Sequence, residues 1–169
     1  MTTERDAGFD EWYVQAYPHV RTAVTLAVGD VDLAEEATAE AFARALVHWA
    51  KVRNATSSHA WVYTVAMNQV RSTLRRRSVE RRWLRKQAGQ PTVHQPPPAE
   101  PDDPLWRAVG QLPRRARTAV ALRYVADLSE SEVAEVMGIA RGTVAATLHQ
   151  ARKRLGELLA DNHEEERTP

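Results

Sequence analysis

The side chains best suited to bind a ligand lie on one face of a predicted helix in the first half of the chain. They follow one another at spacings of 4, 3, 1 and 3, so a helix brings them together. These residues are Thr64, Asn68, Arg71, Ser72 and Arg75. An amide beside guanidinium groups suits hydrogen bonds to the edges of DNA bases and to phosphates. The face therefore predicts nucleic-acid recognition.

The distribution of charge supports a polyanionic partner. The formal net charge is only +1, but the segment from Arg71 to Lys86 holds eight basic residues against Glu80 alone, a net charge of +7. The region from Asp30 to Glu40 is acidic by contrast. Basic surface helices without a nucleic-acid partner exist, but a cluster this dense favours nucleic acid.

A second candidate element for DNA binding spans Leu128 to Leu159, which has the pattern of a helix, a tight turn and a second helix. Ser129 and Glu132 form an S-x-x-E capping box, and Gly138 supplies a left-handed residue that ends the first helix. The polar face of the second helix carries Thr143, Thr147, Gln150 and Arg154. In a helix-turn-helix unit the second helix lies in the major groove. Similar hairpins are also common in proteins that bind nothing, so the pattern alone leaves both interpretations open.

The sequence offers no site for catalysis or for a metal ion. It contains no cysteine, its six histidines are dispersed without metal-ligand spacing, and no Gly-rich phosphate loop is present. We therefore predict that the chain is not an enzyme and has no catalytic residue, metal or cofactor. The sequence has no apolar run long enough to span a membrane and opens without a signal-peptide pattern, which predicts a cytoplasmic protein without membrane insertion.

Two helices are predicted ahead of the polar face. Apolar residues keep helical spacing from Phe9 to Ala27, and Pro18 is expected to kink or restart this helix. Asp32 and Glu35 form a capping-box pattern, which predicts a second helix that runs to about residue 50 with small residues on its buried side.

Charged residues mark another face of the second helix. Glu36, Glu40 and Arg44 fall at i, i+4 and i+8, a row that usually means a solvated face with ion pairs. Residues 51–59 have no apolar period and many turn formers, so they predict a loop. The helix with the polar face is expected to begin near Ser58.

A proline-rich segment divides the chain. Residues 87–104 hold six of the nine prolines, which predicts a semi-extended linker. We therefore expect an all-α protein of two small helical domains, residues 1–86 and 105–160, with an acidic tail over residues 161–169. An apolar segment from Leu105 to Leu112 opens the second domain, Pro113 starts its next helix, and the helix-turn-helix closes it.

Taken in this order, the segments resemble a bacterial extracytoplasmic-function (ECF, group IV) RNA polymerase sigma factor of the sigma-70 family. Region 4 of that family resembles LPRRARTAVALRYVADLSESEVAEVMGIARGTVAATLHQARKRLGELL, residues 112–159. Region 2.2 resembles EEATAEAF, residues 35–42. Regions 2.3 and 2.4 resemble WVYTVAMN, residues 61–68, followed by LRRR, residues 74–77. Each motif is weak alone, but three in the right order around a linker are specific.

The resemblance implies a transcription initiation factor that binds core RNA polymerase and directs it to promoters by −10 and −35 recognition. The implied contacts with core polymerase are Glu36, Glu40 and Arg44, with Phe42 supporting the helix from behind. The implied −10 contacts are Arg53, Asn54, Ser58, Asn68, Arg71, Ser72, Arg75, Arg76 and Arg77. The implied −35 contacts are Arg141, Thr143, Thr147, His149, Gln150, Arg152 and Lys153. Residues 51–59 would hold an extruded base, whose unstacking costs a few kcal/mol.

Further partners follow from the resemblance: a cognate anti-sigma factor is expected, and the free protein is expected to be a monomer. The recognition helix departs from the family pattern, because Ala145, Ala146 and Thr147 stand where Lys or Arg, Ser and Arg are usual, and Gln150 replaces a basic residue. Ala140 replaces the common N-cap Ser, a loss of about 1 kcal/mol for that helix. Each missing phosphate contact should lower the salt dependence of binding by about one unit, so the −35 element is expected to be bound weakly.

The alternative is a free-standing helix-turn-helix regulator that binds duplex DNA as a dimer without polymerase. It accounts for residues 128–159 but leaves the acidic helix and the Asn/Arg face without a purpose. Stoichiometry separates the two, since such a regulator would dimerise and bind duplex DNA unaided.

Overall fold

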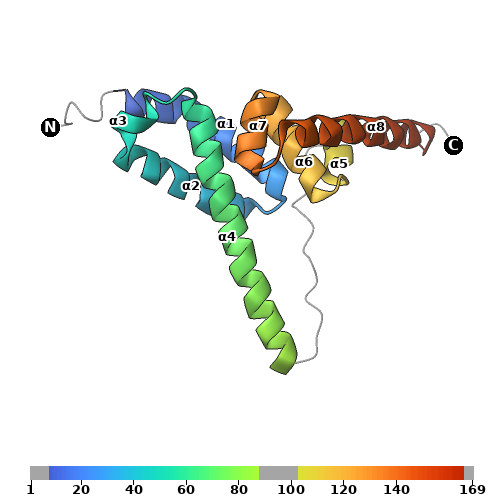
Figure 1. Ribbon diagram of the computed structural model, residues 1–169. Helices are drawn as coiled ribbons and strands as arrows, with labels where there is room; N and C mark the ends of the chain where they lie inside the picture. Colours follow the sequence, from blue (N-terminus) through green and yellow to red (C-terminus); the bar gives the residue numbers. More distant parts are fainter. Residues whose placement is uncertain (1–7, 88–102, 166–169) are drawn as a thin grey trace.

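The computed structural model describes residues 8–87 and 103–165, which form helices and connecting turns without a strand. The first half contains α1 (Phe9–Val28), α2 (Val31–Val47), α3 (Trp49–Val52) and α4 (Ser58–Gln87). The second half contains α5 (Pro104–Gly110), α6 (Arg114–Val120), the π-helical turn η2 (Ala121–Val125), α7 (Glu130–Met137) and α8 (Arg141–Glu165). The predicted all-α fold is confirmed. As Figure 1 shows, α4 projects well beyond the other helices.

Two residues separate α1 from α2. Gly29 has φ 71°, a left-handed conformation that suits glycine and ends α1. Asp30 is extended, and its carboxylate accepts a hydrogen bond from the backbone N–H of Leu33 at 2.9 Å, so Asp30 is the N-cap of α2. The predicted capping pair of Asp32 and Glu35 is therefore wrong. Asp32 already lies in the first helical turn, because α1 ends early enough to leave Asp30 free to cap.

Proline does not interrupt the first helix. α1 runs from Phe9 to Val28 with Pro18 inside it, so the restart considered from the sequence does not occur. Pro18 has no N–H to donate to the carbonyl of Val14. Val14 is highly exposed, where water can serve that carbonyl instead. The Thr22 hydroxyl donates to the Pro18 carbonyl at 2.9 Å on the same helix.

The predicted loop over residues 51–59 is shorter in the structure. Its first residues belong to the short helix α3, which is anchored by the buried side chains of Trp49 and Val52. Its last residues belong to α4, which begins at Ser58 as expected. The Ser57 hydroxyl accepts a hydrogen bond from the Ala60 N–H at 3.1 Å at the start of α4. A single helical turn is too short for a periodic pattern, and burial of its side chains against α1 and α2 helps to stabilise it.

Small residues allow α2 to pack closely in the first half. Its predicted buried side is confirmed, since four alanines are fully buried along it: Ala34, Ala37, Ala41 and Ala45. An aromatic cluster covers one end of this core, with ring centroids of neighbouring pairs 5.0 to 5.9 Å apart. The cluster contains Phe9, Trp12, Tyr13, Tyr17, Phe42 and Trp49. Phe9, Phe42 and Trp49 are buried, Trp12 and Tyr17 are half-buried, and Tyr13 is exposed.

The helix-turn-helix is present as predicted. The Ser129 hydroxyl accepts from the Glu132 N–H, and the Glu132 carboxylate accepts from the Ser129 N–H at 2.8 Å, which completes the capping box. Gly138 has φ 66° and ends α7. Val144, Leu148 and the rest of the predicted apolar stripe of α8 are buried or half-buried.

The two halves share one hydrophobic core. α6 and η2 pack on α1, and α7 packs on α4, so buried residues from both halves form a continuous cluster. Figure 1 shows α6 and α7 beside the helices of the first half. Among the described helices, none has the length and apolar character needed to cross a membrane. The described residues also contain no cluster of three or more His, Asp or Glu side chains that could hold a metal ion.

Candidate nucleic-acid and protein interfaces

The charge row of α2 lies on the protein surface and is supported from behind. Glu36 and Arg44 are exposed, Glu40 is half-buried, and Arg44 donates from Nε to Glu40 Oε1 at 2.6 Å. Phe42 is on the other side of the helix, buried in the aromatic cluster with its ring centroid 5.0 Å from that of Trp12. The row is therefore displayed on a helix whose opposite face is packed.

The polar face of α4 is divided between solvent and the second half of the chain. Asn68 and Ser72 are exposed, but Arg71 is half-buried against the end of α7. Arg71 donates to the carbonyl oxygen of Val136 at 3.1 Å and to that of Met137 at 3.4 Å, and also to the side chain of Asn68. Burial lowers the pKa of Arg71 from its ordinary value. The sequence indicated the face but not this contact, which joins residues 65 and 66 positions apart.

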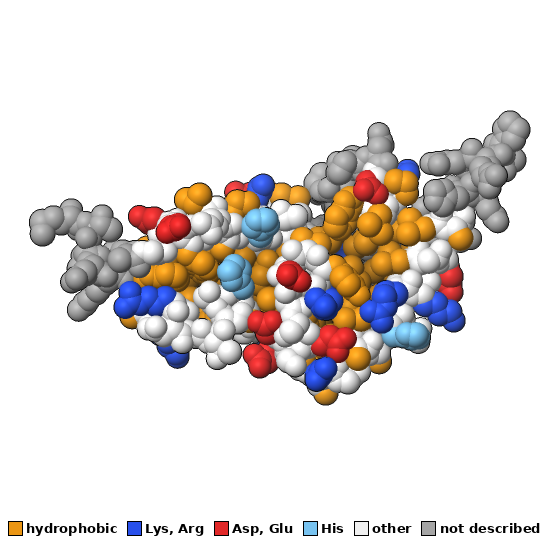
Figure 2. Space-filling model, turned by 90° about the horizontal axis from the view of Figure 1, so that it is seen from above, with side chains coloured by type: hydrophobic (Ala, Val, Ile, Leu, Met, Phe, Trp, Pro, Cys, Tyr) orange, Lys and Arg blue, Asp and Glu red, His pale blue; other side chains and the backbone are white. Residues whose placement is uncertain are grey.

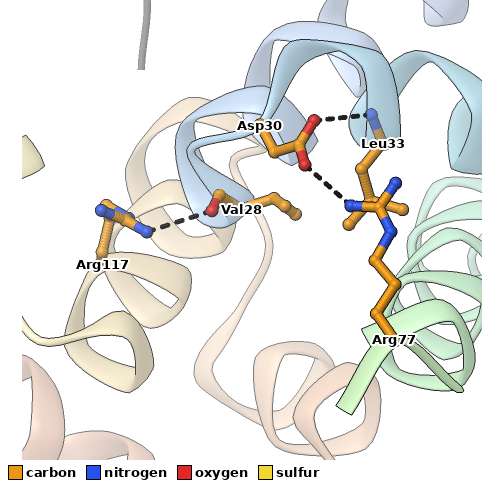
Figure 3. A network of polar contacts seen from close by, with 5 residues as sticks. All are labelled: Val28, Asp30, Leu33, Arg77 and Arg117. Carbon is orange, nitrogen blue, oxygen red and sulfur yellow. Dashed lines mark hydrogen bonds and ion pairs between the residues drawn. The ribbon is translucent and has the colours of Figure 1, made fainter. Parts of the chain in front are cut away.

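The three arginines at positions 75–77 of α4 differ in their hydrogen-bond and ion-pair partners. Arg75, Arg76 and Arg77 are all exposed. Arg76 donates to the Thr73 hydroxyl at 3.3 Å, whereas Arg77 forms an ion pair of 3.1 Å with Asp30. As Figure 3 shows, the Asp30 carboxylate thus bridges the start of α2 and the side chain of Arg77 on α4. Arg77 is therefore tied to the body of the first half.

Two predicted −10 residues lie in the shortened loop between α3 and α4, and a third lies at the start of α4. Arg53 and Asn54 are exposed, and Ser58 is half-buried at the first position of α4. The side-chain amide of Asn54 donates to the Ala50 carbonyl at 2.7 Å, so this residue also fixes the loop. The loop faces the start of α7, because Glu132 interacts with the side chains of Ser57 and His59.

The Glu132 carboxylate is held in its charged form at this junction. Its pKa lies below the ordinary value, chiefly because the Ser129 N–H donates to it. The hydroxyls of Ser57 and Ser129 and the nearby His59 lower the pKa further, against an opposing effect of burial. Figure 2 shows the molecule from above the view of Figure 1, with acidic side chains over the middle, where α7 lies, and basic ones along α8.

The predicted −35 residues line the exposed side of α8. Arg141, His149, Gln150, Arg152 and Lys153 are exposed, and Thr143 and Thr147 are half-buried. Some of them have partners within the second half: Arg141 lies 3.7 Å from a Glu130 carboxylate oxygen, and Arg152 donates to the Tyr124 hydroxyl at 2.9 Å. The Thr147 hydroxyl donates to the Thr143 carbonyl at 2.7 Å. α8 and α4 diverge in Figure 1, so the two predicted DNA-binding sets occupy separate surfaces.

A second arginine, from the second half, donates hydrogen bonds to the first half. Arg117 on α6 donates to the carbonyl oxygen of Val28 at the end of α1, at 3.1 Å, as Figure 3 shows. It also donates to the carbonyl oxygen of Ala27 at 3.4 Å and to that of Gly110 at 3.2 Å. Burial and the neighbouring Arg114 lower the pKa of Arg117. Each half thus supplies a cation to the negative C-terminal end of a helix in the other half.

Comparison with known proteins identifies both halves. Residues 12–80 match the family model of sigma-70 region 2, and residues 102–155 match that of sigma-70 region 4. The ECF RNA polymerase sigma factor EcfG of Rhodopseudomonas palustris is 30% identical over 152 residues, which cover 85% of this chain and 81% of EcfG. The ECF RNA polymerase sigma factor SigW of Bacillus subtilis is 27% identical over 148 residues, 79% of each chain.

The chain is a member of the ECF sigma factor family. It is a transcription initiation factor that binds core RNA polymerase and directs it to promoters by −10 and −35 recognition. The match to region 2 excludes a free-standing helix-turn-helix regulator, which would account for region 4 alone. A solved structure with the same fold is that of the sigma factor RpoE in complex with the anti-sigma factor NepR from Bartonella quintana. The TM-score is 0.72, with 23% identity, over 90% of this chain and 96% of RpoE.

Sequence reasoning missed three features of these surfaces in this sigma factor. The arginine contacts between the halves have no local signal, because the donor and acceptor are far apart in the chain. Asp30, as cap and ion-pair partner, was overlooked in favour of Asp32. The exposed apolar residues Val79 and Trp83 on the distal part of α4 did have a signal, since their i, i+4 spacing places them on one helix face.

Proposed function

We propose that this sigma factor binds core RNA polymerase through Glu36, Glu40 and Arg44 on α2, with Phe42 stabilising the helix from within. The observation that carries this assignment is the exposed charge row on a helix whose other face is fully packed. A rigid, charged helix face can make complementary contacts with a partner without an ordering cost. The short Arg44–Glu40 pair gives the row a defined geometry before binding.

We assign −10 recognition to α4 and the loop before it. The proposed contacts are Arg53, Asn54, Ser58, Asn68, Arg71, Ser72, Arg75, Arg76 and Arg77. The exposed amide of Asn68 beside guanidinium groups supports this assignment, because this combination suits base edges and phosphates. Arg71 gives its N–H groups to α7 in the structure. Promoter contacts through Arg71 therefore require that α7 separates from α4.

We assign −35 recognition to the exposed side of α8. The proposed contacts are Arg141, Thr143, Thr147, His149, Gln150, Arg152 and Lys153. The exposure of most of this set, at the start of the second helix of a helix-turn-helix, supports the assignment. Because alanines replace basic residues nearby, the proposed −35 interaction is weak.

The remaining proposals concern organisation and partners. We propose two functional units, residues 1–86 and 105–160, joined by a linker over 87–104, with an acidic tail over 161–169. Gln87 already belongs to α4, Pro104 to α5, and residues 161–165 to α8. RpoE, which has the same fold, was solved with an anti-sigma factor, and we propose a cognate anti-sigma factor here as well. The free protein is proposed to be a cytoplasmic monomer without catalytic activity of its own, because the polymerase supplies the chemistry.

The docking face can be tested by charge reversal. Glu40→Lys should abolish co-elution of the protein with core RNA polymerase in gel filtration, because it breaks the ion pair with Arg44 and reverses the charge in the middle of the row. The unfolding midpoint in urea should stay near that of the wild type, since the ion pair is largely exposed.

The matched control is Glu11→Lys, which makes the same charge change at an exposed position on α1. This variant should still co-elute with core polymerase. If Glu40→Lys binds core polymerase as tightly as the control does, the α2 row is not the docking face.

A further inference from the structure

The proposed DNA-binding face of α4 continues beyond the body of the protein. From Asn68 and Ser72, steps of 3 or 4 residues lead through Arg75 to a pair on the same side of the helix, Val79 and Trp83. Arg82 lies next to Arg75 in helical phase, about 20° further from Val79. The distal face, defined as Val79, Arg82 and Trp83, is therefore a direct extension of the face assigned to the −10 element.

Apolar side chains on this extension are unusually open to solvent. Val79 is 61% exposed and Trp83 is 59% exposed, although both are large apolar residues. Figure 1 shows that this part of α4 stands clear of the other helices. The two side chains therefore do not contribute to the described hydrophobic core. Tryptophan and arginine are each enriched at protein–protein interfaces, so exposed Trp83 and Arg82 mark a candidate binding surface.

The arginines of distal α4 differ according to the face on which they lie. On the side opposite Val79, Arg77 is paired with Asp30, and Arg81 donates to the Arg77 carbonyl at 3.2 Å. On the side of the distal face, Arg75 and Arg82 are exposed. Among the described side chains of distal α4, Arg75 and Arg82 are open to phosphates and lie on the same side as the exposed apolar pair, which indicates nucleic acid as the occupant.

The length of α4 indicates where on the promoter the distal face would lie. Trp83 lies 15 residues beyond Asn68, which corresponds to roughly 22 Å along a helix at 1.5 Å per residue. A DNA duplex rises by about 3.4 Å per base pair, so this separation matches roughly six or seven base pairs. The C-terminal end of α4 leads in sequence to region 4, the proposed reader of the −35 element. The distal end is therefore directed toward the upstream side of the −10 element.

We propose that the distal face of α4 binds the duplex DNA that directly precedes the −10 element. Arg82 contacts a phosphate, and the Trp83 indole packs with Val79 against the sugars of the same strand. The contact is independent of base sequence and lengthens the bound promoter segment by several base pairs. It rests on the proposed function of α4 in −10 binding, and the test below separates the two.

The experiment combines residue substitution with promoter truncation. Holoenzyme binding is measured on a promoter selected from random DNA by run-off transcription, in two fragments without the −35 element. The long fragment keeps ten base pairs upstream of the −10 element, and the short fragment keeps two. Trp83→Ala should weaken binding to the long fragment by roughly tenfold, the effect expected when a buried aromatic contact is lost. Binding to the short fragment should be unchanged.

The arginine in the same surface gives a second readout. Arg82→Gln should lower the salt dependence of binding by about one unit on the long fragment only. Arg81→Gln removes the same charge from the opposite side of α4 and should leave the difference between the two fragments as in the wild type. Trp83→Phe should retain most of the binding to the long fragment.

Three results would overturn the proposal. Trp83→Ala could bind both fragments as the wild type does, it could weaken both equally, or it could weaken binding to core polymerase without DNA, as expected of a protein-docking face. Asn68→Ala serves as the reference, because it should weaken binding to both fragments. If Asn68→Ala has no effect on either, the proposed −10 face is wrong, whatever the result for Trp83.

Discussion

The two long helices assigned to promoter DNA, α4 and α8, differ in how accessible their polar faces are. α4 is strongly basic, and region 4 covers part of its polar face, where Arg71 donates to carbonyls at the end of α7. α8 is less basic at its start, yet its polar side is exposed. The helix with the larger electrostatic attraction for DNA is thus the less accessible one. Access to the proposed −10 surface depends on the contact between the regions, whereas access to the proposed −35 surface does not.

The contact between the regions is stabilised by a pair of helix-end interactions. Arg71 of region 2 binds the C-terminal end of α7 in region 4, and Arg117 of region 4 binds the C-terminal end of α1 in region 2. Gly29 makes room for the second interaction, because a Cβ atom there would lie 3.1 Å from Arg117 Nη2, and its φ of 71° also favours glycine. Removal of either arginine should therefore affect α4 more than α8.

The largest effect is expected from Arg117→Ala. The substitution removes hydrogen bonds to the Ala27, Val28 and Gly110 carbonyls and should lower the free energy of unfolding by about 1.5 to 3 kcal/mol, as measured in urea. Hydrogen exchange should rise at the contact between α7 and α4. Arg115→Ala on the same helix is the control, because Arg115 is exposed. Equal stability of the two variants would mean that the arginine does not hold the regions together.

A smaller effect is expected from a substitution that strengthens DNA binding by α8. Thr147→Arg adds a cation on the proposed −35 surface and should make the salt dependence of binding to −35 duplex steeper by about one unit. This change would reduce the difference in charge between the two helices. Ala160→Arg adds the same charge to an exposed position near the other end of α8. If both variants change the salt dependence equally, the effect comes from net charge, and the start of α8 is not the DNA-binding surface.

The smallest effect is a pH dependence at the start of α7. The pKa of Glu132 is lower in the folded protein than its ordinary value of 4.5, so its contribution to stability is present above that value. The contribution is lost as the pH falls through the lowered pKa, when the carboxylate takes up a proton. Hydrogen exchange at the first turn of α7 should therefore increase below about pH 4.5.

Glu132→Gln is the control for this pH dependence. Glutamine can keep the capping box but carries no titratable group, so the variant should show no change in this range beyond the intrinsic pH dependence of exchange. A variant with the same profile as the wild type would assign the pH dependence to another group.

Much of the fold was predictable because it depends on local signals. The apolar stripes of α2 and α8, the capping box of Ser129 and Glu132, and the helix end at Gly138 all follow from residues a few positions apart. Failures occurred where local signals compete or are too short. Asp30 and Asp32 are both good N-caps, and only the end of α1 decides between them. α3 spans four residues and depends on buried Trp49 and Val52.

The candidate surfaces were predictable in composition but not in accessibility. Helical spacing was enough to place Asn68 and Arg71 on one face of α4, and Glu36, Glu40 and Arg44 on one face of α2. The spacing of Val79 and Trp83 would have extended the face of α4 in the same way. Which of these residues another helix covers depends on contacts between the regions.

Most of the helices, several of their caps and their chemically distinct faces follow from the sequence, because these depend on interactions over one or two helical turns. The packing of α7 on α4 and of α6 on α1 is apparent only in the folded structure. The polar contacts between these helices join a guanidinium group to backbone carbonyls 65 to 90 positions away. Every residue has a carbonyl, so no residue type marks the acceptor in advance, and only the packed helices bring donor and acceptor together.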